Sequence, residues 1–312
     1  EYIKMVVLVF LLANIIKTEK DLKEISLVLV SLITFLVLYA YYRYKTEGLE
    51  ISVPSLYYVD RNFFAESIVA ILPLAFIFYE ENKSRIKQLI FLGITAVMAG
   101  GVILTYSRGG LLALLIVLFF LFLQSKRKVP TVVMGIIILL LFLPHIGQKY
   151  RNRMSTIQTY EEDRSAMARI VTWRAGMNML TEHPVIGVGA GNYNDLFIYY
   201  RPPELSKFGA QGISIHNIFV QILSETGLAG GGLFILVIIS SFLAVRKINR
   251  QNKLLQQDKR FNLAIPNALR ISLIGFCGAG FFLPGVYHGY IYIIFALIMA
   301  SKRIYLSKIK QF

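Results

Sequence analysis

The chain has 312 residues, of which 56% are hydrophobic and only 16% charged, with a mean hydropathy of +0.59 and a net charge of +15. A soluble domain carries about 45–50% apolar and about 25% charged residues, so this composition excludes an ordinary soluble enzyme, a disordered chain and a disulfide scaffold. The excess falls in long runs almost without charge, such as 111–123 and 132–143. The composition therefore predicts an all-α polytopic membrane protein.

Nine stretches are candidates for membrane-spanning helices, because a span needs about 20 apolar residues. They lie at 2–16, 24–42, 63–79, 87–106, 109–123, 130–146, 216–245, 269–283 and 286–300. Ser107-Arg108-Gly109-Gly110 separates the fourth from the fifth, and two glycines after a charge predict a tight turn between two helices. The chain begins at Glu1, not Met, and is already apolar by Met5. We expect it to be truncated at the N-terminus, with further spans upstream.

The basic residues predict the direction of the spans. Five segments hold twenty Lys and Arg residues: 17–23, 83–87, 126–128, 246–270 and 302–310. The short loops opposite hold four, which are Arg43, Lys45, Arg61 and Arg108. Because Lys and Arg collect in cytoplasmic loops, the C-terminus is predicted to be cytoplasmic. Segments 43–62, 107–108, 147–215 and 284–287 then face outward, and no nucleic-acid partner is needed to explain the charge.

Segment 147–215 is the one long polar stretch, and it divides the chain into N-terminal transmembrane helices (1–146), a periplasmic loop (147–215) and C-terminal transmembrane helices (216–312). The loop is rich in arginine and poor in lysine: its arginines are Arg151, Arg153, Arg164, Arg169, Arg174 and Arg201. Arginine suits a site that grips phosphate with a planar fork of fixed charge. The alternative is a solvated loop whose arginines are balanced by its acidic residues.

Within this loop, the segment from Arg164 to Leu180 is predicted to be helical. Its spacing places Arg169, Trp173, Gly176 and Leu180 on one face. His183-Pro184 is predicted to end the helix. The glycine-rich run 187–191 that follows can cradle a phosphate, but it lies in no βαβ unit, which favours a turn that leads the chain back into the protein.

Three ionisable residues stand out at the ends of spans or inside them. Arg108 lies between two apolar helices, where an ionisable residue is costly and indicates function, although a snorkelling arginine at the interface is the alternative. His216 stands where the outer loop enters the seventh span and can accept a proton near neutral pH. Ser214 or Asn217 can cap that helix. Glu225, further along that helix, can pair with an arginine. His288, in the outer loop between the last two spans, can line a cavity together with these residues.

No metal or cofactor is expected. The chain has a single cysteine, Cys277, and neither a Cys pair nor a His-x-x-x-His motif. Glu161-Glu162-Asp163 can bind a hard cation, but consecutive acids on a loop are more often solvated. No Walker motif occurs.

The order of motifs resembles the O-antigen ligase and O-antigen polymerase superfamily. Thr-x-Ser-Arg-Gly-Gly lies between two spans, followed by Arg-x-x-x-Trp (169–173) and His-Pro-x-x-Gly-x-Gly (183–189) in a long outer loop. His-Asn (216–217) then opens the next helix, which contains Glu-x-Gly (225–227). The resemblance covers about 60–300 and implies a fold similar to the membrane-embedded GT-C glycosyltransferases. It also implies a place in the bacterial inner membrane with the active site on the periplasmic face.

Members of this superfamily transfer glycan from an undecaprenyl-diphosphate carrier to an acceptor hydroxyl. The resemblance implies that arginines hold the diphosphate and that a histidine acts as general base, without a required metal. By motif position, Arg108, Arg169 and His216 match these functional residues. Arg153 is the choice for a third diphosphate-binding arginine. The weaker candidates are Arg151, Arg174, Glu225 and His288.

Ligases and polymerases share this pattern, so the acceptor stays open. It can be the lipid A core of lipopolysaccharide, another glycan repeat, or a protein, as in a protein O-oligosaccharyltransferase. A small-anion transporter is the competing class, because transporters also combine many spans with intramembrane charges. A transporter is expected to place such charges at mid-depth and to show internal symmetry. Here the arginines and His216 gather at the outer surface, which favours the enzyme.

Overall fold

The computed structural model describes residues 2–48, 60–129, 131–133, 135–136, 164–203, 215–254, 263–283 and 289–310. Helices make up the regular structure of these residues, and no strand occurs among them. Five of the helices are long and apolar enough to cross a membrane: α2 (Glu19–Glu47), α3 (Arg61–Glu81), α4 (Arg85–Leu104), α10 (Ile218–Leu254) and α12 (Gly289–Lys310). The predicted class, an all-α polytopic membrane protein, is confirmed.

Three further helices overlap predicted spans but are shorter than the five long helices. They are α1 (Tyr2–Ile15), α5 (Arg108–Gln124) and α11 (Ala264–Gly280). The predicted span at 130–146 falls mostly outside the described residues. The number of nine spans is therefore not confirmed. The tight turn predicted at Ser107-Arg108-Gly109-Gly110 is present, but it lies at 105–107, and Arg108, Gly109 and Gly110 are the first residues of α5.

The chain divides into two compact units. The bundle unit comprises Glu1–Phe142, Ile238–Gly278 and Tyr287–Phe312, and the loop unit comprises Leu143–Val237 and Ala279–Val286. Helix α10 contributes its first part to the loop unit and its second part to the bundle unit. The boundaries predicted from sequence, at 146 and 215, remain a prediction.

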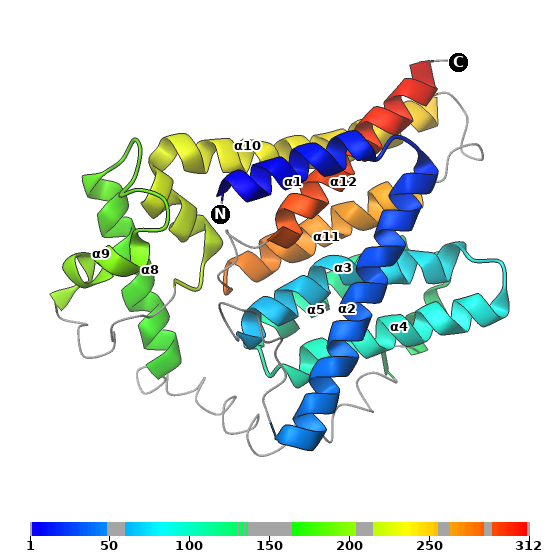
Figure 1. The fold of residues 1–312 in the computed structure, drawn as a ribbon, viewed down its shortest axis with the longest axis horizontal. Helices are drawn as coiled ribbons and strands as arrows, with labels where there is room; N and C mark the ends of the chain where they lie inside the picture. Colours follow the sequence, from blue (N-terminus) through cyan, green and yellow to red (C-terminus); the bar gives the residue numbers. More distant parts are fainter. Residues whose placement is uncertain are drawn as a thin grey trace. The chain divides into compact units, whose positions relative to one another are not determined.

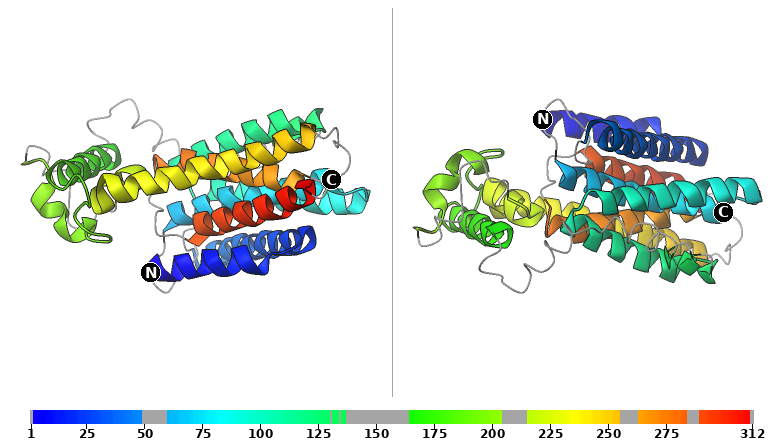
Figure 2. Two further views of the ribbon diagram at one scale, coloured as in Figure 1. Left: turned by 90° about the horizontal axis from the view of Figure 1, so that it is seen from above. Right: turned by 90° about the horizontal axis from the view of Figure 1, so that it is seen from below.

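Helix α3 is the centre of the bundle unit. Its side chains are buried from Phe64 to Glu80 on every face, and it packs against α2, α4, α5 and α12 (Figure 1). Its buried side chains include the carboxylates of Glu66 and Glu80, which are costly to expose to lipid, so an enclosed position suits this helix. Helices α1 and α12 lie side by side in the views of Figure 2. Within this unit α5 packs against α3 and α4, which positions its first residue, Arg108.

One end of the bundle unit gathers basic segments that the sequence places on a single side. Lys308 of α12 pairs with Glu19 of α2 at 3.0 Å. Arg303 of α12 donates a hydrogen bond to the carbonyl oxygen of Ile16, between α1 and α2. These contacts join the segments 17–23 and 302–310, as the predicted alternation of spans requires. The side of the membrane that this end faces remains a prediction.

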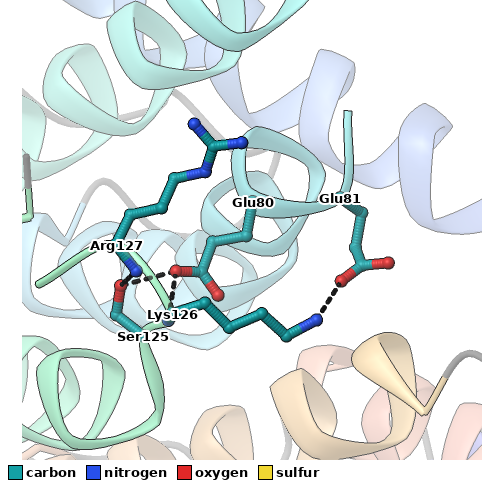
Figure 3. A network of polar contacts seen from close by, with 5 residues as sticks. All are labelled: Glu80, Glu81, Ser125, Lys126 and Arg127. Atoms are coloured by element: carbon teal, nitrogen blue, oxygen red, sulfur yellow. Dashed lines mark hydrogen bonds and ion pairs between the residues drawn. The ribbon is translucent and has the colours of Figure 1, made fainter. Parts of the chain in front are cut away.

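The turn after α5 is joined to the end of α3 by a buried carboxylate (Figure 3). Glu80 accepts hydrogen bonds from the Ser125 hydroxyl and from the backbone N–H of Lys126, the latter at 3.0 Å. The Lys126 ammonium group pairs with Glu81 at 3.1 Å on the surface. Backbone groups at a helix end need partners when they are buried, and Glu80 supplies one here. The segments 83–87 and 126–128 are thereby held at the same end.

The loop unit has its own hydrophobic core between α8 (Arg164–Glu182) and α9 (Tyr193–Tyr200), drawn in green in Figure 1. Helix α8 ends at Glu182, directly before His183-Pro184, as predicted. The core is a cluster of six buried side chains, namely Val171, Ala175, Met179, Tyr193, Phe197 and Ile215. Ile215 brings the entry to α10 into the same cluster. This core fixes α8 and the start of α10 relative to each other.

Candidate functional site

The turn between α4 and α5 places Arg108 at the first position of α5. The Thr105 hydroxyl donates to the carbonyl oxygen of Val102 at the end of α4, at 2.6 Å. Tyr106 then takes a left-handed conformation, with φ of 54°, and reverses the chain. The Ser107 hydroxyl caps α5 by accepting from the backbone N–H of Gly110 at 3.1 Å. Thr105, Tyr106 and Ser107 thus each help to form the turn, and Arg108 is held half-buried at a helix N-terminus.

This turn is also tied to the start of α3. The Ser107 hydroxyl donates to the Asn62 side-chain oxygen at 2.8 Å, and Asp60 caps α3 by accepting from the Asn62 backbone N–H at 2.6 Å. Gly110 packs so closely that a Cβ there would lie 2.6 Å from the Cβ of Ala65. The N-termini of α3 and α5 are therefore adjacent. Because each helix N-terminus carries partial positive charge, this end of the bundle unit favours anions.

Sequence reasoning missed Glu66, the residue after Ala65 in α3. Its side chain is only 3% exposed. Both of its carboxylate oxygens lack a hydrogen-bond partner among the described residues. A carboxylate inside an apolar run was the available signal, since ionisable residues in spans are costly. The flanking Phe and Ala residues made the segment look like an ordinary helix core.

In the loop unit, Arg169 lies on α8 two residues before Val171 of the hydrophobic cluster and is half-buried. The buried stripe of α8 runs through Val171, Ala175 and Met179, with Gly176 beside it. The face predicted from sequence is therefore displaced, and only its Gly176 is fully buried. Trp173 flanks the stripe and packs against the cluster. Arg174 is exposed on the same helix.

His216 stands between the hydrophobic cluster and the start of α10. Ile215 before it is buried in the cluster, and Asn217 after it is the helix cap. The Asn217 side-chain oxygen accepts from the backbone N–H groups of Phe219 and Val220, at 2.9 and 3.1 Å. Of the two residues that the sequence offered as caps, Asn217 fills the role, while Ser214 lies outside the described residues. His216 is thus half-buried with fixed neighbours on both sides.

Arg169 and His216 are brought to the edge of the same cluster, which contains Val171 and Ile215. The cluster is reinforced by Tyr193, whose hydroxyl donates to the carbonyl oxygen of Thr172 at 2.6 Å. Burial raises the pKa of Tyr193 above its ordinary value, so that this hydroxyl stays a neutral hydrogen-bond donor. The two candidate residues are therefore positioned by one packed core.

Helix α10 is broken at Gly227, which has φ of 64° and ψ of −166°. The glycine-rich loop after α8 fills this break. The backbone N–H groups of Val188 and Gly189 donate to the carbonyl oxygens of Ser224 and Glu225, at 3.0 and 2.9 Å. The loop therefore completes the hydrogen bonding of a broken helix. This agrees with a turn that leads back into the protein and gives the glycines a role other than a phosphate cradle.

The break at Gly227 and the glycine-rich loop that fills it are called the loop joint below, and Glu225 is part of it. Its carboxylate accepts from the backbone N–H of Gly191 at 3.0 Å and from that of Tyr193. Those groups lie at the N-terminus of α9, whose own cap residue, Asn192, makes no side-chain cap hydrogen bond. Glu225 therefore caps α9 from another helix. The structure explains this buried carboxylate by backbone contacts, where the sequence suggested an arginine.

Three of the predicted site residues, Arg151, Arg153 and His288, lie outside the described residues.

His183 is described. It is exposed and contacts the Tyr200 hydroxyl at 3.1 Å, which holds the end of α8 to α9. Within the described ranges, no group of three or more His, Cys, Asp or Glu side chains is arranged to hold a metal ion.

Comparison with protein families gives one finding. Residues 93–235 match the family model described as O-antigen ligase. The matched stretch includes the turn with Arg108, helix α8 with Arg169, and the start of α10 with His216 and Glu225. No curated protein matches the chain significantly.

Proposed function

We propose that this chain, of which residues 93–235 match the O-antigen ligase family, transfers glycan from undecaprenyl diphosphate to an acceptor hydroxyl at the periplasmic face of the bacterial inner membrane. The family supports membrane-bound glycosyl transfer of the ligase or polymerase type. The donor, the acceptor and the mechanism are the proposal. The observation that carries it is the match over 93–235, because this one stretch contains Arg108, Arg169 and His216.

The proposed role of Arg108 and Arg169 is to hold the diphosphate. A diphosphate leaving group develops negative charge as the bond to the sugar breaks, and fixed guanidinium groups stabilise that charge without a metal. Arg108 supports this role by its position at the first residue of α5, where helix N–H groups add to its charge. Arg169 supports it by being half-buried beside a rigid cluster. Arg153 is proposed as the third arginine, on motif position alone.

His216 is proposed as the general base. An imidazole nitrogen takes the proton of the acceptor hydroxyl while the oxygen attacks the anomeric carbon of the donor sugar. The bond from that carbon to the diphosphate oxygen breaks, and undecaprenyl diphosphate leaves. The cap at Asn217 and the buried Ile215 support this role, because a base must be held in position to act.

The test uses the full-length natural protein in a host without its own ligase. Transfer of undecaprenyl-linked glycan to the lipid A core is measured for the wild type, His216→Ala and Arg169→Ala at matched membrane expression. We expect His216→Ala to lower transfer by about 10²- to 10⁴-fold, and Arg169→Ala by about 10²- to 10³-fold.

Two variants outside the proposed site serve as controls. Glu182→Ala removes an exposed side chain of the same unit, and Arg250→Ala removes an exposed arginine near the other end of α10; both are expected to transfer like the wild type. Equal transfer by His216→Ala and the wild type would overturn the assigned roles. A wild type that only lengthens the carrier-linked glycan is a polymerase, and transfer to a protein would identify an O-oligosaccharyltransferase.

A further inference from the structure

Helix α10 is too long to lie in a bilayer as one straight span. Its 37 residues would extend about 55 Å at 1.5 Å per residue, whereas the hydrocarbon core is about 30 Å thick. The break at Gly227 divides it into a short arm, 218–226, and a longer second part. The sequence of this second part, 228–254, indicates which of its residues cross the hydrocarbon core of the bilayer.

From Leu228 to Val245 the helix carries no charge, and Arg246 and Lys247 follow directly. These residues number about 18, which corresponds to about 27 Å of helix and matches the hydrocarbon core. Arg246 and Lys247 then mark one boundary, as charged residues do at the ends of spans. Leu228 accordingly marks the other boundary, the one at the broken end of α10.

The loop after α8 is fastened to that boundary by backbone hydrogen bonds. The backbone N–H of Leu228 donates to the carbonyl oxygen of Pro184 at 2.8 Å, and that of Ala229 donates to Val185 at 3.1 Å. A Cβ on Gly227 would collide with the carbonyl of Val185, so the two backbones are in direct contact. The loop and the start of the span therefore share one depth.

At this depth the loop exposes its largest apolar side chains. Val185 is 64% exposed, Ile186 is 74% exposed and Leu228 is 61% exposed. The same apolar character continues down α10 through Leu233 and Leu236, which are 65% and 60% exposed. No charged residue occurs between Pro184 and Asn194. In water such a patch would be unfavourable, but it is continuous with a surface that a membrane span turns to lipid.

We propose that Val185 and Ile186 insert into the leaflet at the broken end of α10, the predicted outer leaflet, and contact phospholipid acyl chains. The loop then acts as a second, shallow membrane contact for the loop unit. Because the same loop caps the break beside Glu225, this contact fixes the height of the α8–α9 core above the bilayer. Interfacial apolar side chains bind membranes in this way.

The test measures depth directly and does not depend on catalysis. In a Cys277→Ser background, which removes the single native cysteine, a cysteine replaces Ile186, Leu236 or Asn194 and is labelled with an environment-sensitive fluorophore. Leu236 is the lipid control within the span, and Asn194, exposed on α9, is the aqueous control. The proteins are placed in phospholipid vesicles without any polyprenyl carrier. Quenching by acyl-chain nitroxide and by aqueous iodide is compared.

We expect the label at Ile186 to be quenched several-fold more by the lipid nitroxide than the label at Asn194, and to be protected from iodide like that at Leu236. Iodide quenching equal to that at Asn194 would overturn the proposal. Lipid quenching that appears only after addition of undecaprenyl diphosphate would also overturn it, in favour of a groove for the donor. Trp173 fluorescence, which reports the core of the loop unit, verifies that each variant is folded.

Discussion

Two glycine-containing turns stand beside candidate site residues, and their glycines are required for different reasons. In the bundle unit, Gly110 follows Arg108 with ordinary helical geometry, and the missing side chain lets α5 approach Ala65 of α3. In the loop unit, Gly187 and Gly227 have positive φ, of 67° and 64°. Added side-chain atoms there would meet backbone, that of Glu225 and of Val185 respectively.

The difference decides what a substitution must cost. At Gly110 the neighbour is the Cβ of Ala65, so the strain is relieved when α5 and α3 move slightly apart. At Gly187 and Gly227 the neighbour is backbone held by hydrogen bonds, which cannot move without breaking them. In addition, an L-residue with a side chain is strained at positive φ. The contact at Gly110 is therefore one of close helix packing, whereas the loop joint is built from backbone and tolerates a substitution of its glycines less well.

The chain offers one native probe for each unit. Trp173, the single tryptophan, packs against the loop unit's cluster, and Cys277, the single cysteine, lies half-buried on α11 of the bundle unit. Thermal unfolding in detergent can therefore be followed by Trp173 fluorescence and by the reactivity of the Cys277 thiol with a fluorogenic maleimide. The two transitions report the two units separately.

The largest effect is expected for Gly227→Ala. Positive φ costs about 1–3 kcal/mol for a residue with a side chain. The hydrogen bonds from Leu228 and Ala229 to the loop, each worth about 1 kcal/mol, are lost as the backbones separate. We expect a loss of about 4 kcal/mol, seen as a lower midpoint of the Trp173 transition. A Cys277 transition that falls as far as the Trp173 transition would contradict the separation of the two joints.

Gly110→Ala tests the other side of the comparison. The added methyl group would lie 2.6 Å from the Cβ of Ala65, so α5 must move away from α3. Overpacking of this kind costs about 1–3 kcal/mol. We expect the Cys277 transition to move and the Trp173 transition to stay. Gly93→Ala, where a Cβ meets nothing within 4 Å, is the control on α4 and should lower neither midpoint, because alanine favours a helix more than glycine does.

The helices of the bundle unit could be predicted from sequence, because apolar runs of span length have few alternatives in a membrane. The turn at Ser107 and the end of α8 at His183-Pro184 were equally readable. The face of α8 was not, since Arg169 and Trp173 share a helical spacing that competes with the true stripe through Val171 and Ala175. Periodicity alone does not distinguish two overlapping stripes.

The role of Glu225 was also unreadable from sequence. Beside the nearby Gln221 side chain, its partners are backbone N–H groups at Gly191 and Tyr193, more than thirty residues earlier in the chain. Because every residue except proline carries a backbone N–H, such a partner cannot be recognised from the amino-acid sequence. The break at Gly227 was hidden for the same reason: glycines are common in membrane helices, and only the contact with the loop shows that this one has positive φ.

Replacement of Glu225 sharpens the comparison at the loop joint. Glu225→Ala removes the acceptor of the backbone N–H groups of Gly191 and of the buried Tyr193, which costs about 1–3 kcal/mol. Glu225→Gln keeps an acceptor oxygen, so we expect it to recover at least half of the shift in the Trp173 transition. If the two variants unfold at the same temperature, the cap is not what Glu225 contributes.

Gly191→Ala gives the smallest effect and separates the two costs that act together at Gly227. Gly191 has φ of 84°, but a Cβ there meets nothing within 4 Å. Only the backbone strain remains, about 1 kcal/mol, so the Trp173 midpoint should fall by roughly a quarter of the shift in Gly227→Ala. A shift as large as that of Gly227→Ala would mean that strain, and not the contact between loop and broken helix, accounts for the cost at both glycines. The joint would then be held by the conformation of single residues, and the fixed depth of Val185 and Ile186 would lose its main support.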